Sequence, residues 1–258
     1  MIARARLVAD VAPDGGTRII TARSDAPLAL RITPTGVYMV GSAAGPLGGD
    51  DLALDVEVRS GADLTVRTSA ASVALPGNGP SRVRVTASVG KGGRLQWLPE
   101  PTVAAAGCDH HVQCRVELDG DALLVWREEI VLGRHDEAAG SIEAGLYVDL
   151  DGTPLLRQNL GLGPGHSGWD GPAVIGSYRA VGSTLVVGPA IAGASSKATE
   201  AFLSETAAVM ALAGPAVHVT ALAPEALTLR RQLDAGLDWL VAAISARASE
   251  SALVRAEE

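Results

Sequence analysis

VEVRSGADLTV, residues 56–66, consists of a segment with alternating apolar residues, a turn that contains glycine, and a second alternating segment. The same pattern returns in ASVGKGGRLQW (87–97) and VELDGDALLVW (116–126). The turns SGAD, GKGG and DGDA supply residues that tolerate positive φ, as tight reversals between strands require. The chain therefore contains three loose copies of a strand–turn–strand unit.

The spacing of the copies suggests how they assemble. Aligning Leu64, Leu95 and Leu124 gives steps of 31 and 29 residues. A β unit of about 30 residues that is stacked on its copies forms a solenoid-like or layered sheet, because no unit buries its apolar face alone. A sandwich of ordinary hairpins gives a similar pattern, so both arrangements remain open here.

The rest of the chain extends this mainly β prediction. We expect one domain over 1–258, with a β-rich body over 1–195 and two helices separated by a strand over 196–258. SSKATEAFLSETAAVMALAG (195–214) has serine caps and a terminal glycine, which predict the first helix. AVHVTALA (216–223) reads as a strand, and leucines recur at helical spacing after Pro224, which predict the second helix.

Composition excludes several classes of function. The formal net charge is −8 and the basic residues are scattered, which argues against a nucleic-acid partner. No N-terminal apolar segment resembles a secretory signal, and no apolar run is long enough to span a bilayer. We therefore expect a cytoplasmic protein without membrane contact. Two cysteines are too few for a disulfide scaffold.

CDHHVQC, residues 108–114, is the most metal-like stretch. Thiolate and imidazole groups suit borderline metals such as nickel or zinc. In a strand, Cys108, His110 and Cys114 would face one side and His111 the other. A partly exposed strand that happens to contain these residues is the competing interpretation.

REEIVLGRHDE, residues 127–137, supplies carboxylates. Glu128 and Glu137 could line a polar passage for a cation, but a solvated strand end and loop is the simpler interpretation of these residues. No Ser/His/Asp order or paired-carboxylate spacing indicates catalysis, so we expect a non-enzyme.

Two glycine-rich stretches look like phosphate-binding loops but lack the required context. GPGHSG (163–168) matches G-x-G-x-x-G, yet Gly171 and Pro172 prevent the helix that a dinucleotide site needs, and a surface loop is expected. GPLGGDD (45–51) precedes a strand instead of a helix. We expect Gly48 and Gly49 to form a structural corner that the Asp50 carboxylate braces.

Several pieces in order resemble the UreD/UreH family of urease accessory proteins. The corner AGPLGGD is similar to the family pattern G-G-L-x-G-G-D. Further matches follow in RTSAAS (67–72), LQWLPEPTV (95–103), Glu128 with the LGR of 132–134, Glu137, and VTALAPEALTLRRQLDAGLDWL (219–240). The chain departs from the family at Pro46, Val73, Leu75, Ala105-Ala106 and Arg127, where a Trp is usual.

The resemblance implies a scaffold and metallochaperone without a tightly bound cofactor. Such a protein would bind the F-type urease accessory protein, reach the G-type accessory GTPase through it, and dock on the urease apoprotein. Nickel would pass to urease along a polar route, for which Cys108, His110, His111, Cys114, Glu128 and Glu137 are the candidate contacts.

Two other functions fit the sequence. One is a β-rich metal-dependent hydrolase that uses Cys108, His110 and His111, which would hold metal tightly. The other is a structural adaptor that has no part in nickel transfer.

Overall fold

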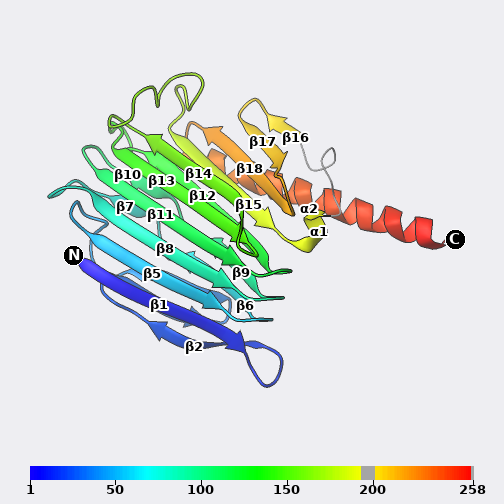
Figure 1. The fold of residues 1–258 in the computed structure, drawn as a ribbon. Coiled ribbons are helices and arrows are strands. Elements are labelled where there is room, and N and C mark those ends of the chain that lie inside the picture. Colours follow the sequence, from blue (N-terminus) through cyan, green and yellow to red (C-terminus); the bar gives the residue numbers. More distant parts are fainter. Residues whose placement is uncertain (193–200, 257–258) are drawn as a thin grey trace.

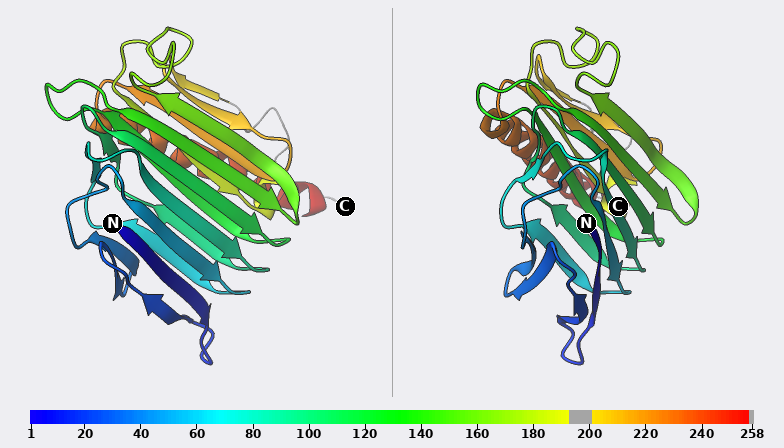
Figure 2. Two further views of the ribbon diagram at one scale, coloured as in Figure 1. Left: turned by 60° about the vertical axis from the view of Figure 1, so that its left-hand side comes forward. Right: turned by 90° about the vertical axis from the view of Figure 1, so that its left-hand side faces the viewer.

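Two stacked β-sheets and one long helix make up the computed structural model, which describes residues 1–192 and 201–256. Figures 1 and 2 show the sheets as two layers, with the helix on the far side of the larger one. The smaller sheet has seven strands in the order β14 (Thr153–Leu162), β13 (Ser141–Leu150), β11 (Asp109–Leu118), β8 (Ser81–Val89), β5 (Asp51–Val58), β1 (Ile2–Val11) and β2 (Thr17–Arg23).

The larger sheet has 11 strands. Its main order is β16 (Ala201–Ser204), β17 (Ala207–Ala211), β18 (Ala216–Ala223), β15 (Ala180–Val187), β12 (Leu123–Leu132), β9 (Arg94–Leu98), β6 (Asp63–Thr68), β4 (Gly36–Gly41) and β3 (Leu28–Thr33), and β10 (Thr102–Ala104) and β7 (Ser72–Ala74) continue beside β12.

The three copies of the repeat build a solenoid. Each copy gives one strand to each sheet, so β5, β8 and β11 pair in parallel in one layer and β6, β9 and β12 in the other. Leu64 pairs with Leu95, which pairs with Leu124, as the alignment of the repeats requires. The turns join different sheets, so they are arches and not hairpins, and their central glycines have positive φ. The solenoid prediction is confirmed, and the sandwich of hairpins is excluded for these units.

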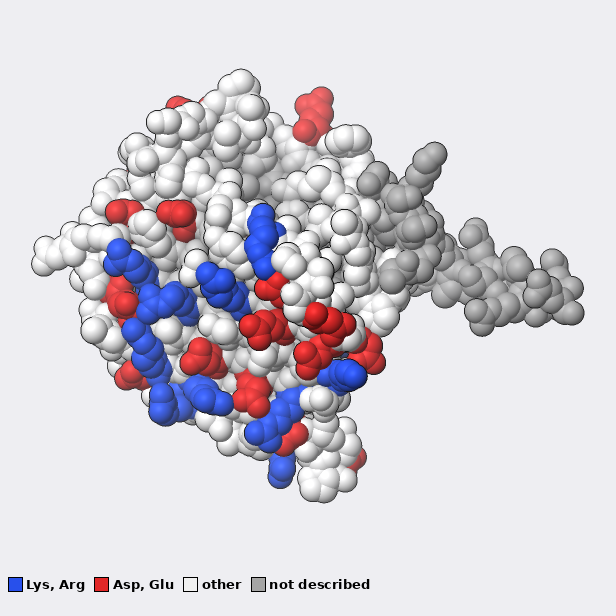
Figure 3. Space-filling model, viewed as in Figure 1, with Lys and Arg blue, Asp and Glu red and all other residues white. Residues whose placement is uncertain are grey.

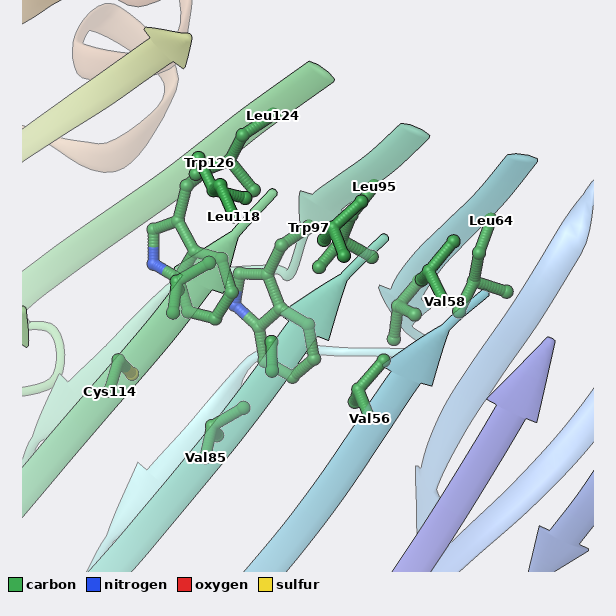
Figure 4. Close-up of a cluster of buried hydrophobic side chains, with 14 of the residues drawn as sticks. Val56, Val58, Leu64, Val85, Leu95, Trp97, Cys114, Leu118, Leu124 and Trp126 are labelled. Carbon is green, nitrogen blue, oxygen red and sulfur yellow. The ribbon is translucent and has the colours of Figure 1, made fainter. Parts of the chain in front are cut away.

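Small aliphatic side chains and two tryptophans fill the space between the arches. Trp97 and Trp126 occupy equivalent positions of successive repeats, and their rings stack with centroids 4.8 Å apart (Figure 4). Leucines and valines of the repeat strands surround the two rings and are almost fully buried. This end of the sandwich is therefore a solid core, which anchors the strands that reach the other end.

The 201–211 segment differs from its prediction. Residues 201–211 were expected within a helix, but they form the hairpin of β16 and β17, which extends the larger sheet through β18. Residues 195–200, the start of that expected helix, lie outside the described part of the chain. The two helices of the C-terminal region are the single turn α1 (Pro189–Ala192) and the long α2 (Ala226–Ala256).

Helix α2 covers the outer face of the larger sheet. Leu229, Leu233 and Leu240 are buried against β15, β17 and β18. Gly236 permits this close approach, because a Cβ there would lie 2.4 Å from a methyl group of Val219. No helix in the described residues is long and apolar enough to cross a membrane.

Ion pairs also fasten α2 to β12. Arg127 contacts Asp234 at 2.5 Å, and Arg230 contacts Glu129 at 2.5 Å and Glu100 at 3.2 Å. The Glu129 side chain is fully buried. These contacts lie on the face of β12 opposite to the space between the sheets.

The outer face of the seven-stranded sheet is a solvated polar surface. Basic and acidic residues are interspersed over it (Figure 3), and several are paired across strands, such as Arg84 with Asp51 and Arg6 with Glu57. Because opposite charges alternate here, no one-sign patch marks this face as a site for a highly charged ligand.

Candidate functional site

Two cavities open between the sheets and adjoin inside the protein. The loop-side cavity has a volume of about 480 Å³, and residues of segments 39–46 and 68–75 line its mouth. The edge-side cavity has a volume of about 430 Å³ and lies among β14, β15 and the strands β16 to β18. Both cavities are lined by Glu128, Ile130 and Ala144, so these side chains form their junction.

Strand alternation places Glu128 at this junction. Along β12, Trp126 and Ile130 belong to the clusters between the sheets, and Glu128 shares their face. Arg127 and Glu129 point the other way, toward α2. The Glu128 and Glu129 side chains therefore lie on opposite faces of β12.

Burial dominates the electrostatics of Glu128. Glu128 is half-buried and keeps some accessible surface in the cavities, but the protein around its carboxyl group raises its pKa by desolvation, although hydrogen bonds from Trp126 and Cys114 oppose the shift. The Trp126 Nε1 donates to Glu128 Oε1 at 3.2 Å. Burial also raises the pKa of the Cys114 thiol, and the neighbouring Glu128 charge adds to that effect. A cation that reaches this point can replace the proton that burial favours.

A row of hydroxyl groups leads from Glu128 into the edge-side cavity. Glu128 on β12 pairs with Ser183 on β15, and Ser183 pairs with Thr220 on β18. All three line the edge-side cavity, and Gln158 lines it from the opposite sheet with a buried Oε1 that has no hydrogen-bond partner in the structure. This cavity thus presents neutral oxygen atoms beside the carboxyl group of Glu128, and Glu205 also lines it.

The loop-side cavity is more apolar and holds the softer groups. Trp97, His110 and Cys114 line it. His110 Nδ1 lies 2.8 Å from the Ser81 hydroxyl. Burial lowers the pKa of His110 from 6.5 to about 4, so the imidazole is neutral at pH 7.

The remaining metal candidates lie elsewhere. The Cys108 thiol is buried and donates to the Ser141 carbonyl at 3.6 Å, and burial raises its pKa. His111 lies on the outer face of the sheet, between Asp109 and Glu143. Hydrogen bonds from the Arg134 side chain and amide lower the pKa of Glu137 to about 2 and hold it in a surface loop.

These positions remove the basis for a tight metal centre. Among the described residues, no three His, Cys, Asp or Glu side chains are grouped so that they could hold a metal ion. His110 and His111 face opposite sides of β11, so the trio of Cys108, His110 and His111 that a hydrolase would need does not converge. The structure brings only Cys114 and Glu128 of the six candidates into direct contact.

The GPLGGD corner has the geometry of a structural turn. Asp50 accepts hydrogen bonds from the Leu47 amide at 2.9 Å and from the Met1 amine at 2.5 Å. Gly49 has a φ of 93°, and a Cβ on Gly48 would lie 2.5 Å from the Gly77 amide nitrogen. The corner thus packs backbone against backbone. The GPGHSG stretch is a loop without a following helix.

Sequence reasoning missed Ser183, Thr220 and Gln158. No local motif marks these residues, because they meet Glu128 only through pairing between strands that are far apart in the chain. The alternation of residues in STLVV and HVTAL was the one available signal for which side chains face inward.

Comparison with known proteins identifies the family. The family described as UreD urease accessory protein matches residues 2–255. This chain belongs to the UreD family. Similar relatives include the urease accessory protein UreD of Frankia casuarinae, which is 44% identical over 91% of this chain and 88% of its own length. UreD 3 of Streptomyces griseus is 45% identical over 95% of this chain and 98% of its own length. The expected resemblance is confirmed.

Proposed function

We propose that this chain acts in urease maturation as a scaffold and a route for nickel, without catalysing a reaction itself. Membership of the UreD family supports the role in maturation. The observation that carries the nickel route is the pair of adjoining cavities, which together run from the loops at 39–46 to the edge of the larger sheet, with Glu128 at their junction.

The lining suits passage better than storage. A conducting path must attract an ion enough to admit it and bind it weakly enough to release it. The two cavities are lined by one thiol, a neutral imidazole, several hydroxyl groups and the carboxyl groups of Glu100, Glu128, Glu129 and Glu205. Among the described residues, no three His, Cys, Asp or Glu side chains are grouped so that they could hold one ion. Nickel would therefore exchange ligands stepwise. At the junction it would meet Glu128, the acidic residue that lines both cavities.

The proposed partners are those of the family resemblance. The chain would act in complex with the F-type accessory protein, reach the G-type GTPase through it, and dock on the urease apoprotein. Nickel is cargo in this proposal and not a resident cofactor.

Two variants test the route at the junction. Glu128→Gln keeps the acceptor for Trp126 and removes the charge, and Ala144→Leu adds bulk where both cavities meet. Glu143→Gln is the matched control, because it lies next to Ala144 in sequence but on the outer face of β13. The assay combines purified apo-urease, the accessory proteins and limiting nickel, and it measures nickel per urease active site and the resulting activity.

We expect both junction variants to lower nickel loading at least several-fold, and the control to match the wild type. If all three variants load nickel normally while a strain that lacks the chain cannot, the protein is an adaptor and not a route. If urease acquires nickel equally well without the chain, the whole proposal is wrong.

A further inference from the structure

The edge-side cavity ends at β16, which has no further strand beside it among the described residues. The inward-facing row that begins at Glu128 continues from Thr220 to Ala208 on β17, and from Ala208 to Phe202 on β16. Phe202 is the only phenylalanine of the chain, and it is 94% exposed. It lines the same cavity as Glu128. The floor of the cavity therefore runs without interruption to the last strand of the sheet and stops at an exposed aromatic ring.

The edge at β16 differs from the edges at β2, β3 and β14. The three-residue β7, which pairs only with β10 among the described strands, is also uncharged, but a bridge between Leu47 and Leu75 lies next to it. Unpaired edge strands attract other chains, and proteins commonly protect them with charged residues or proline. The edges at β2, β3 and β14 follow this rule: exposed charges occur on β2 (Arg18 and Arg23), β3 (Arg31) and β14 (Arg157, with Pro154). The β16 sequence AFLS has no charge and no proline. Within the described part of the chain, its outer side has no strand partner.

We propose that an extended, uncharged segment of a partner protein adds as a strand to the outer edge of β16 and packs an apolar residue against Phe202. This inference rests on the proposed function, because it locates where the cargo-exchanging partner docks.

Two features define this occupant. The edge of a sheet presents its N–H and C=O groups in the plane of the sheet, so extended backbone satisfies them best. A large exposed ring on an uncharged strand is the kind of anchor that dominates binding at interfaces. The other residues of β16, Ala201, Leu203 and Ser204, carry no charge that would repel an uncharged strand.

A strand that pairs with β16 would also extend the lining of the edge-side cavity. A strand added beside β16 would carry its own residue next to Phe202 and so prolong the Glu128–Phe202 row onto the partner. Val174, which is 39% exposed, lines the same cavity from the loop after β14. The partner would thus cover the cavity mouth and continue its floor across the interface.

The test uses Phe202→Asp, which removes the ring and adds a charge to the edge, and Phe202→Leu, which keeps an apolar anchor. Ile32→Asp is the matched control, because Ile32 is 59% exposed on β3, the opposite edge of the same sheet. Each full-length variant is titrated against the purified F-type protein, the F–G complex and apo-urease, and circular dichroism and thermal melting establish that it is folded. Hydrogen exchange of the 201–204 amides is compared in the free chain and in each complex.

We expect Phe202→Asp to weaken binding to one of these partners roughly tenfold or more, which is the size of a hot-spot effect. Phe202→Leu should lose less, Ile32→Asp should bind as the wild type does, and the 201–204 amides should become protected in that complex. Equal affinities for Phe202→Asp and Ile32→Asp, or unprotected 201–204 amides in every complex, would overturn the inference. An effect of Phe202→Asp on self-association alone would also overturn it, since the occupant would then be a second copy.

This test separates the two proposals. If wild-type chain is needed for nickel loading but the β16 edge stays exposed in all complexes, the docking inference fails and the nickel route stands. If the wild-type chain is dispensable for loading, the proposed function fails regardless of what binds at β16.

Discussion

Replacing Arg230 with methionine removes the main partner of a buried carboxylate. Arg230 Nε donates to Glu129 Oε1 at 2.5 Å, and the Glu129 side chain has no exposed surface. The other oxygen, Oε2, has no hydrogen-bond partner in the structure, and Arg127 is the nearest remaining cation at 4.0 Å. The variant therefore leaves a poorly compensated charge under α2.

The magnitude follows from this burial. Removing one member of a buried ion pair costs about 3–5 kcal/mol because the other charge stays buried without its partner. The Arg230 side chain is 26% exposed and Arg127 gives partial compensation, so we expect the lower end, about 3 kcal/mol. For a protein of this size such a loss lowers Tm by roughly 6–12 °C.

The pH dependence gives a second signature. Burial raises the pKa of Glu129 above its ordinary 4.5, and Arg230 opposes that rise. Arg230→Met should therefore raise it further. A carboxyl group with a raised pKa binds protons more readily in the folded state, so its unfavourable contribution grows as pH rises through the folded pKa and disappears near pH 4.5. The deficit of the variant should be largest at neutral pH and shrink toward pH 4.5.

The assay is urea denaturation followed by circular dichroism between pH 4.5 and 8. Arg231→Met is the matched control, because Arg231 is the next residue of α2, is exposed, and has no ion pair in the structure's described residues. Glu129→Gln in the Arg230→Met background should recover most of the lost free energy of unfolding at neutral pH. Equal free energies of unfolding for Arg230→Met and Arg231→Met would refute the reasoning.

Three further predictions follow from local geometry. Glu128→Gln should raise the free energy of unfolding at neutral pH, and the gain should vanish toward pH 4.5, because a carboxyl group whose pKa is raised in the folded state lowers stability only at pH values above its ordinary pKa of 4.5; a gain that is independent of pH would contradict this. Gly48→Ala should cost about 1–3 kcal/mol in urea unfolding, since its Cβ would meet backbone atoms of Gly77 and Gly79, whereas Gly41→Ala, with its nearest atom 3.7 Å away, should stay near the wild type. Glu137→Gln should be less stable than the wild type above pH 4.5 and should converge with it as pH falls through about 2, the pKa of Glu137; thermal melts across this range would show a constant difference if the Arg134 contacts did not matter.

The repeat could be predicted because its signals are local and consistent. Each copy contains its own alternating strands and its own glycine turn, so equivalent leucines could be aligned before any pairing was known. The long helix α2 was predictable for the same reason, since leucines at helical spacing follow a proline at its start.

The hairpin at 201–211 could not be predicted in this way. SETAAVMALA is rich in alanine and has the composition of a helix, because alanine has the highest intrinsic helix propensity. In the fold, the same residues pair with β18, so Ala207 and Val209 are buried against α2. A strand partner and a covering helix outweigh the small differences in local propensity, and both lie outside the segment itself.

Only part of the candidate site could be predicted from the sequence, for a related reason. Glu128 and Cys114 stood out because carboxyl and thiol groups are chemically distinctive, but serine, threonine and glutamine are ordinary residues until their neighbours are known. Ser183 and Thr220 acquire a role only from their register beside Glu128. Proximity in sequence was also a poor guide: Cys108 and His111 lie within two residues of His110, yet their side chains contact different surroundings.

Strand β12 links the helix to the cavities, and this link can be measured. Arg127 and Glu129 hold α2, while Glu128 between them faces the junction, so the ion pairs of α2 do not involve the side chain at the junction, although Glu129 also borders the loop-side cavity. Arg230→Met should therefore destabilise the fold without altering nickel loading, provided that the assay is run well below its melting temperature. Glu128→Gln should lower nickel loading without destabilising the fold. If Arg230→Met lowered nickel loading while fully folded, the ion pairs would also set the position of Glu128. The two faces of β12 would then be functionally coupled.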